Sequence, residues 1–334
     1  GVPQPTRGQS GAKQTPDDEG RDVPPDVLVS NDYSDDAAVI LRKDDQRTLI
    51  MTADVIAPIV NDPETFGEIA AANSISDIYA MGGQPLFALN LVFFPDDKLP
   101  QEILYRILQG GARACLRMGV SIIGGHTVRN SDIKYGLSVV GECLPEKVLH
   151  NRGARPGEAL VLSKALGTGI IGTAIKEGCA TEEMIQNAVN SMTRSNALAL
   201  QIAERYRLGA CTDVTGFGLL GHLGNILRGS NLQASIHMKN LPLLHGAFEC
   251  AEKGLIPGGS KKNLEYLRAT VKISGEENPL LTLLAADAQT SGGLLFTVHP
   301  DDAVKLTEEL VESSHAAAMI GHVDALGTDQ EPHV

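Results

Sequence analysis

The chain of 334 residues contains no Trp, and aromatic residues make up only 4% of it. Proteins that hold single-stranded nucleic acid use aromatic side chains as stacking platforms, so this class is disfavoured. Basic residues are also scarce: 28 Lys and Arg stand against 41 Asp and Glu, and the net charge is −13. A surface of this sign repels the phosphate backbone. We therefore expect no nucleic-acid partner, and an anionic substrate would have to arrive with a divalent cation.

Long apolar runs and paired cysteines are missing as well. No apolar stretch approaches the roughly 20 residues of a membrane-spanning helix, and no signal peptide is recognised. The five cysteines are far apart and form no CxxC pair; they are Cys115, Cys143, Cys179, Cys211 and Cys250. An odd, scattered set favours reduced, buried thiols over a disulfide framework or a zinc site. These features predict a cytoplasmic protein without a membrane partner.

Length and an apolar content of 43% predict a globular protein of two domains. Residues 1–26 are rich in Pro and Gly, so we expect a flexible tail that could act as a lid. The turn-rich Gly153–Gly157 marks a boundary between an N-terminal domain at 27–152 and a C-terminal domain at 153–334. Both parts mix strands and helices, and the predicted fold class is mixed α/β (α+β).

One stretch predicts a helix whose two ends are both specified. Asp62 suits the N-cap, Pro63 the first helical position, and the pair Gly82–Gly83 the end. Within this helix Asn73 and Asp77 lie one turn apart on a face that also carries apolar residues. Two explanations remain open at this point: satisfied polar groups in a core, or part of a metal–phosphate site.

Further aspartates stand where elements are expected to begin or end. Asp35 and Asp36 precede an apolar strand, Asp54 lies at the end of a strand predicted at 48–55, and Asp213 sits in a polar break before a glycine-rich turn. Adjacent carboxylates repel, so an acidic loop of this kind is costly unless a cation binds there. A solvated turn and a helix cap are the alternative interpretations.

Carboxylates can hold a triphosphate only through a cation such as Mg²⁺, which bridges them to phosphate oxygens. Donors to the phosphates would come from Lys13 in the tail and from the Gly124–Thr127 segment after a strand, where paired glycines let the backbone approach a ligand. A core role for His126 is the alternative. These residues predict a metal-dependent enzyme of phosphate chemistry, without naming its substrate.

A second glycine-rich segment is misleading. Gly167–Gly172 matches G-x-G-x-x-G, the dinucleotide-binding signal. No acidic residue ends a second strand about 20 residues later, as that motif requires; a helix over Glu182–Leu208 is expected instead. We therefore predict a tight turn and close helix packing here. Farther along, Leu255–Asn263 is expected to be a loop and Leu294–Val298 a strand.

Segments in a fixed order resemble the selenophosphate synthetase (selenide, water dikinase) family. They are SDDAAV at Ser34–Val39, the central helix with its flanks, IIGGHT at Ile122–Thr127, SKALGTG, TDVTGFGLLGHL at Thr212–Leu223, and DAQTSGGLL at Asp287–Leu295. The resemblance implies a two-domain fold like that of aminoimidazole ribonucleotide synthetase, in a homodimer with a shared β-barrel. The implied reaction converts ATP, selenide and water into selenophosphate, AMP and phosphate.

The resemblance also assigns residues. Asp36, Asp77 and Asp213 would bind Mg²⁺, and Ser10 and Lys13 would occupy the catalytic positions of the tail. The ATP site would be lined by Lys13, Tyr33, Ser34, Asp35, Asp54, Asp77, Gly125, His126 and Thr127.

The tail departs from the family pattern, which reads roughly Gly-Cys-Gly-Cys-Lys where this chain has Gln9–Lys13. Ser10 stands at the first thiol position, and a hydroxyl stays protonated and cannot carry selenium as a thiolate can. Two alternatives therefore stay open. One is a Cys-less paralog that binds Mg-ATP with little selenide activity, and the other is a related small-molecule kinase such as thiamine-monophosphate kinase.

Overall fold

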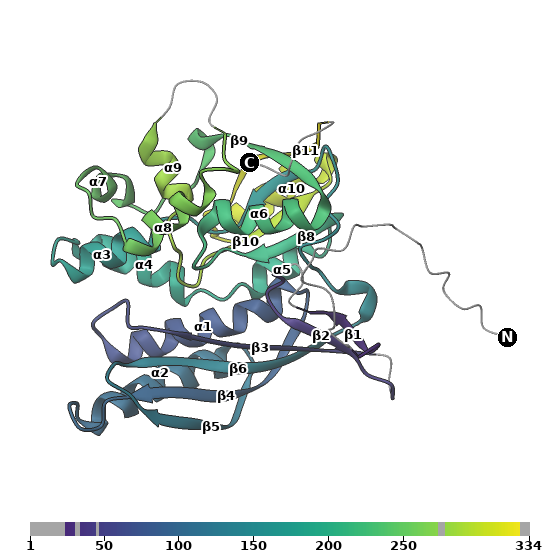
Figure 1. The fold of residues 1–334 in the computed structure, drawn as a ribbon. Helices are drawn as coiled ribbons and strands as arrows, with labels where there is room; N and C mark the ends of the chain where they lie inside the picture. The colour runs from purple at the N-terminus through teal and green to yellow at the C-terminus, as the bar shows by residue number, and fades with distance from the viewer. Residues whose placement is uncertain (1–23, 31–33, 45–46, 273–277, 328–334) are drawn as a thin grey trace.

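The computed structural model describes residues 24–30, 34–44, 47–272 and 278–327. The predictions for Ser10, Lys13 and Tyr33, and for most of the tail, lie outside these ranges. Two sheets are stacked one above the other with helices between and around them (Figure 1). No helix within the described ranges is both long enough and apolar enough to cross a membrane.

The N-terminal sheet has six strands in the order β1-β2-β3-β6-β4-β5. Its strands are β1 (Val27–Val29), β2 (Ala38–Leu41), β3 (Thr48–Ile56), β4 (Gln84–Phe94), β5 (Ser121–Arg129) and β6 (Lys134–Cys143). Neighbouring strands are antiparallel except β4 and β5, which run parallel. Helices α1 (Pro63–Ala80) and α2 (Gln101–Arg117) lie on one face of this sheet. The other face of this sheet is partly exposed and carries apolar side chains.

The C-terminal sheet has five strands in the order β8-β10-β7-β11-β9, and all neighbours are antiparallel. They are β7 (Ala159–Leu162), β8 (Leu208–Asp213), β9 (Leu232–Ile236), β10 (Leu294–Val298) and β11 (Ala318–Ala325). The helices around it are α3 (Thr168–Lys176), α4 (Glu182–Thr193), α5 (Ala197–Ala203), α6 (Gly218–Ser230), α7 (Ala247–Glu252), α8 (Gly258–Leu267), α9 (Pro279–Ala285) and α10 (Pro300–Glu312). Every residue of β7 and β10 is buried, so these strands form the centre of this half.

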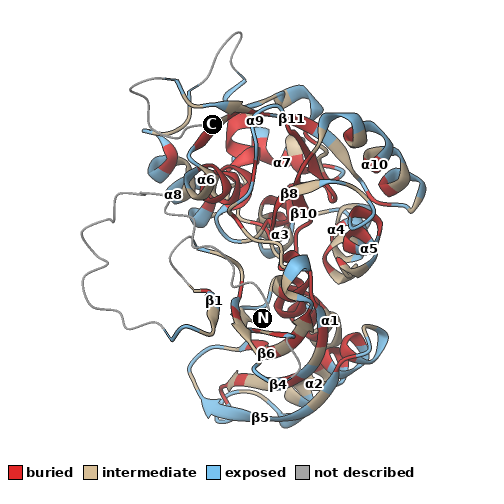
Figure 2. Cartoon of the chain, turned by 90° about the vertical axis from the view of Figure 1, so that its right-hand side faces the viewer, coloured by how far each residue is buried: buried red, intermediate tan, exposed pale blue. Residues whose placement is uncertain are grey.

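Helix α1 begins and ends as its sequence predicts. The Asp62 side chain accepts a hydrogen bond from the backbone N–H of Thr65 at 2.8 Å, and Gly82 follows the helix with a φ of 74°. The helix is, however, buried nearly all round rather than on one face (Figure 2). The reason is that the sheet, α2 and the C-terminal half each cover a different side. One continuous hydrophobic cluster accordingly runs from the N-terminal sheet through α1 into the C-terminal half.

Glycines let α1 and α2 approach closely. A Cβ atom on Gly110 would overlap the carbonyl oxygen of Glu64, and one on Gly67 would overlap that of Ile107. Backbone stands in the way in both cases, and a side chain cannot be accommodated by a rotamer change. The short distance between the two helix axes therefore depends on glycine at both positions.

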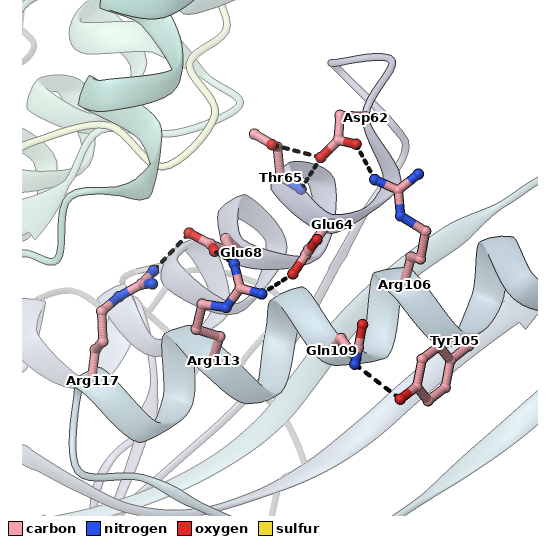
Figure 3. Close-up of polar contacts among 9 residues, drawn as sticks. All are labelled: Asp62, Glu64, Thr65, Glu68, Tyr105, Arg106, Gln109, Arg113 and Arg117. Carbon is pink, nitrogen blue, oxygen red and sulfur yellow. Dashed lines mark hydrogen bonds and ion pairs between the residues drawn. The ribbon is translucent and has the colours of Figure 1, made fainter.

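Ion pairs flank this contact at the surface (Figure 3). The pairs are Arg106–Asp62, Arg113–Glu64 and Arg117–Glu68. The arginine side chains are about half exposed, so each pair contributes at most about 1 kcal/mol. Burial of the apolar residues of α1, and not these charges, holds the two helices together.

Four local expectations were wrong. The helix expected over Glu182–Leu208 is two helices, α4 and α5, followed by strand β8, and Asp213 ends that strand instead of lying in a break. The loop expected at Leu255–Asn263 is largely helix α8, which begins at Gly258. Among the cysteines four are buried, but Cys179 is exposed.

Candidate active site at the junction of the two halves

Four aspartates from separate segments come together where the two halves meet. Asp36 precedes β2, Asp54 lies on β3, Asp77 on α1, and Asp213 at the end of β8. Burial raises the pKa of Asp77 and of Asp213, and neighbouring charges add to it: those of Asp213 and Asp36 at Asp77, and that of Asp54 at Asp213. The structure therefore gathers the four carboxylates that the sequence singled out in these segments.

Asp36 and Asp213 form the innermost pair. Burial, followed by the charge of Asp213, raises the pKa of Asp36 well above its usual range. Burial raises the pKa of Asp213 to about 6, against the effects of a hydrogen bond from Ser76 and the charge of Lys164. Thr212 Oγ1 donates to Asp36 Oδ1 at 2.8 Å. Two carboxylates this close repel each other when both are ionised, and a bound cation would remove that repulsion.

The other two carboxylates are held from α1 and β3. Thr52 Oγ1 donates to Asp77 Oδ2 at 2.5 Å, and Asn73 Nδ2 donates to Asp54 Oδ2. The Asn73 Oδ1 atom in turn accepts from the backbone N–H of Ser291 at 2.8 Å, in the loop before β10. Asn73 is thus a satisfied buried amide that also orients a carboxylate, and its part in a metal–phosphate site stays a prediction.

Oxygen ligands for a hard cation are available here. Within the described residues, Oδ2 of Asp36 and Oδ2 of Asp213 are buried without a hydrogen-bond partner, and so is Oδ2 of Asp35. Unpaired buried carboxylate oxygens are costly, and a cation such as Mg²⁺ would satisfy them. As the described side chains stand, no three His, Cys, Asp or Glu converge tightly enough to enclose a metal ion. The donor set fits Mg²⁺, which takes one or two carboxylates and completes its shell with phosphate and water.

The loop that carries Asp35 and Asp36 is tied to the start of the second half. The Asn151 backbone N–H donates to Asp35 Oδ1 at 2.7 Å, and its Nδ2 donates to the Ser34 carbonyl at 2.9 Å. Ser34 itself is exposed and has a φ of 53°, in the left-handed region. These bonds place the acidic loop over the end of β8.

Lys164, a buried lysine that the sequence analysis did not identify, lies beside these carboxylates. Lys164 Nζ donates to the carbonyls of Arg194 at 2.7 Å and Ser291 at 3.0 Å. Burial lowers its pKa to about 7, while the charge of Asp213 opposes that shift. The signal that could have found it is a Lys two residues after a wholly apolar strand, where a charged side chain is rarely buried unless it is paired.

His222 connects the cluster to α6. The Thr215 backbone N–H donates to its Nε2 at 3.1 Å, which places the proton on Nδ1, 3.3 Å from Thr212 Oγ1. Burial lowers the pKa of His222 to about 4, so the ring is neutral at physiological pH. A buried, neutral His bonded to the threonine that holds Asp36 supports the carboxylate from behind.

Gly125, His126 and Thr127 are not brought to the carboxylates. They lie on β5, an exposed edge strand (Figure 2), with β6 and β4 between it and β3 (Figure 1). Gly125 pairs with Asn90 of β4, and a Cβ atom there would meet the Asn90 backbone, so glycine lets the strands approach. Within one chain these residues and the aspartates form two separate groups.

The glycine-rich segment Gly167–Gly172 lies at the start of α3, and its backbone N–H groups bind side chains of the same chain. Gln289 Oε1 accepts from the backbone N–H groups of Gly167 and Thr168, and Asp287 Oδ2 accepts from those of Gly169 and Ile170. The N–H groups that a dinucleotide phosphate would need are therefore already used. This confirms that the G-x-G-x-x-G match serves internal packing.

Two family models match the chain, one in each half. Residues 34–143 match the AIR synthase related protein, N-terminal domain, and residues 155–330 match the AIR synthase related protein, C-terminal domain. Thiamine-monophosphate kinase from Stenotrophomonas maltophilia K279a has a similar structure, with a TM-score of 0.66, 21% identity and coverage of 93% of this chain and 92% of that one. At this identity the likeness shows the fold alone. Fold and site thus define a two-domain α/β protein of the AIR synthase related class, as predicted.

Curated relatives narrow this class. The chain is 42% identical over 303 residues to selenide, water dikinase of Myxococcus xanthus, covering 90% of this chain and 86% of that protein. It is 43% identical over 297 residues to selenide, water dikinase of Carboxydothermus hydrogenoformans, covering 89% and 86%. The chain therefore belongs to the selenide, water dikinase family. The family name denotes a phosphotransferase, which confirms the class of enzyme expected from the sequence.

Proposed function

We propose that the chain makes selenophosphate, converting ATP, selenide and water into selenophosphate, AMP and phosphate in a Mg²⁺-dependent reaction. The observation that carries this proposal is the gathering of four aspartates, with unpaired buried oxygens on Asp36 and Asp213, at the junction of the halves. A triphosphate brings the charge and the oxygen atoms that complete the shell of a cation held there. The names of the relatives supply the acceptor, selenide.

The residues divide into two roles. Asp36, Asp77 and Asp213 hold Mg²⁺, which withdraws charge from the phosphoryl group being transferred. Ser34, Asp35, Asp54 and Tyr33 contact the nucleotide, and Lys13 of the tail reaches its phosphates. Ser10 stands where a thiol would hold selenium, so this chain would take selenide directly from solution.

A homodimer would bring Gly125–Thr127 to a nucleotide. The open face of the N-terminal sheet carries exposed apolar side chains from three strands; they are Met51, Phe87, Leu89, Ile123 and Val128. Apolar groups gathered on one sheet face favour contact with another sheet. A second copy of the chain covering this face would form the shared β-barrel and place β5 of one subunit near the other.

Anaerobic turnover with ATP, selenide and Mg²⁺, followed by ³¹P NMR, tests the proposal. AMP and selenophosphate are the expected products, and Ser10→Cys should raise the rate at low selenide concentration, because a thiolate can hold selenium. ADP as the sole nucleotide product would replace the proposal with a small-molecule kinase. Binding of Mg-ATP without turnover, even in Ser10→Cys, would indicate a catalytically silent paralog.

A further inference from the structure

A cavity of about 310 Å³ lies beside the carboxylates, between α6 and α8, and Ser34 of the acidic loop forms part of its rim. The side chains that give it its character are Phe217, Asn225, Arg228, Lys262 and Tyr266. Its volume is at the lower end of the range of cavities that bind small molecules, roughly 300–1,000 Å³. It is therefore large enough for one compact ligand.

The charge of this cavity is opposite to that of the protein. Arg228 and Lys262 line it, and no Asp or Glu is found among the described residues of its wall, although the whole chain has a net charge of −13. Arg228 Nη2 donates to Oδ1 of the neutral Asn225, so neither cation is paired with a carboxylate of the described wall, and both charges can act on a bound anion. The cavity therefore selects for negative charge.

Two aromatic rings are left open to solvent at the same place. Phe217 is 64% exposed and Tyr266 is 78% exposed, in a chain that has only 4% aromatic residues. Exposed rings beside a cavity are suited to stacking against a planar ligand. Inorganic phosphate or a simple carboxylate would contact the two cations but neither aromatic ring.

The walls of the cavity are fixed before any ligand arrives. The Phe217 ring packs on His222 with 5.9 Å between ring centroids, and His222 is held by the backbone of Thr215. On the other wall, Asn263 Nδ2 donates to the carbonyls of Gly216 at 2.9 Å and Ala286 at 3.1 Å, which fastens α8 to the turn before α6. Preorganised walls of this kind lower the entropic cost of binding.

We propose that this cavity binds a planar aromatic ring that carries an anionic group, and that its ligand is a nucleoside monophosphate. The rings stack on the base while Arg228 and Lys262 hold the phosphate. The choice of AMP as the particular ligand rests on the proposed function, in which AMP is a product. The site connects to the carboxylates through Phe217, His222 and Thr212, so bound AMP would contact the support of Asp36.

Calorimetry with AMP in Mg²⁺-free buffer tests the site, using the background variant Asp77→Asn to disable the proposed nucleotide site. Replacing both rings, Phe217→Ala with Tyr266→Ala, should weaken AMP binding at least about 10-fold, and Arg228→Gln should do the same by removing a phosphate contact. Tyr105→Ala and Lys253→Gln, an exposed ring and an exposed cation elsewhere, are the matched controls and should leave AMP binding unchanged. Adenosine and ribose 5-phosphate, each carrying half of the recognised features, should bind at least about 10-fold more weakly than AMP.

The proposal is overturned if the ring variant binds AMP as the wild type does, or if AMP binding disappears in Asp77→Asn alone, since AMP would then sit in the carboxylate site. Equal binding of ribose 5-phosphate and AMP would also overturn it, by leaving only an anion site. Absence of AMP binding in every form would do so as well. A melting curve of each variant shows that it is folded. These measurements do not involve turnover, so they test AMP binding in the cavity independently of the proposed synthesis of selenophosphate. Either proposal can be overturned while the other is supported.

Discussion

Asp213 and Asp287 are both buried aspartates whose pKa is raised by burial to about 6, yet the structure uses them differently. The Asp287 carboxylate accepts hydrogen bonds from Ser260 Oγ, from Gln289 Nε2 and from two backbone N–H groups of α3. Asp213 has a buried Oδ2 without a partner among the described residues and faces other carboxylates. A raised pKa alone therefore does not mark a functional residue, and what distinguishes Asp213 is an unsatisfied oxygen among other carboxylates.

Asp213→Asn tests the difference between the two aspartates most directly, and it should have the largest effect. If Asp213 binds Mg²⁺, the amide should lower the rate of AMP formation at least about 100-fold, because the cation loses a charged ligand. The melting temperature should not fall, since the substitution also removes charge repulsion from a buried site. Asp97→Asn, at an exposed aspartate, is the control for both measurements. A variant that retains full activity would remove Asp213 from the proposed metal site.

Asp287→Asn should have the opposite profile. An amide nitrogen replaces one acceptor oxygen, so buried donors lose a partner and the free energy of unfolding should fall by about 1.5–3 kcal/mol. Urea unfolding followed by circular dichroism measures this loss. The activity per folded molecule should be retained, because Asp287 faces α3 and not the carboxylates. Lost activity at unchanged stability would contradict the structural role assigned here.

The smallest expected effect concerns pH. The pKa of Asp213 rises from 3.8 to about 6 on folding, so its contribution to stability is complete below about pH 4 and is lost as pH rises through 6. The unfolding free energy of the wild type minus that of Asp213→Asn should fall by on the order of 2 kcal/mol between pH 4.5 and 7.5. Asp36 and Asp77 add to this fall, because the charge of Asp213, after burial, also raises their pKa. The opposite effect of His222, whose pKa is lowered, cancels in this difference.

Mg²⁺ then separates the two aspartates. At pH 7.5, added Mg²⁺ should raise the melting temperature of the wild type and of Asp287→Asn, because a cation that binds only the folded state stabilises it. It should have much less effect on Asp213→Asn. Equal stabilisation of all three proteins would mean that Mg²⁺ binds elsewhere.

Local signals in the sequence were enough for the ends of α1. Asp62 and Gly82 act on the backbone within one turn, so their effect does not depend on the rest of the fold. The burial of α1 on every side could not be predicted in the same way. It depends on helices and strands more than a hundred residues later in the sequence, which supply the third covering surface.

Elements with weak local propensity were missed for a similar reason. Strand β8 has the sequence LGACTD, in which small residues give no alternating pattern, and it becomes a strand by pairing with β10. Helix α8 begins with Gly-Gly-Ser-Lys-Lys, which favours a loop until Asn263 and Ser260 bond to the neighbouring turn and to Asp287.

For the candidate active site, the aspartates in the sequence already indicated a bound cation. Asp36, Asp54, Asp77 and Asp213 were identified as carboxylates at positions where burial is costly, and the fold brings them together. A lysine close behind an apolar strand is visible in the sequence, but the partners of Lys164 are the carbonyls of two distant loops, and only the fold shows them.

The backbone of Ser291 limits how the two halves of the chain can separate. Its N–H is bonded to Asn73 on α1 and its carbonyl to Lys164 after β7, while Asn196 next to it bonds to α1 as well. Parting the halves along this seam would strip buried polar groups of their partners, at about 1–3 kcal/mol for each group. These bonds therefore resist separation of the two halves. We expect substrate and product to pass Ser34, which is exposed to water.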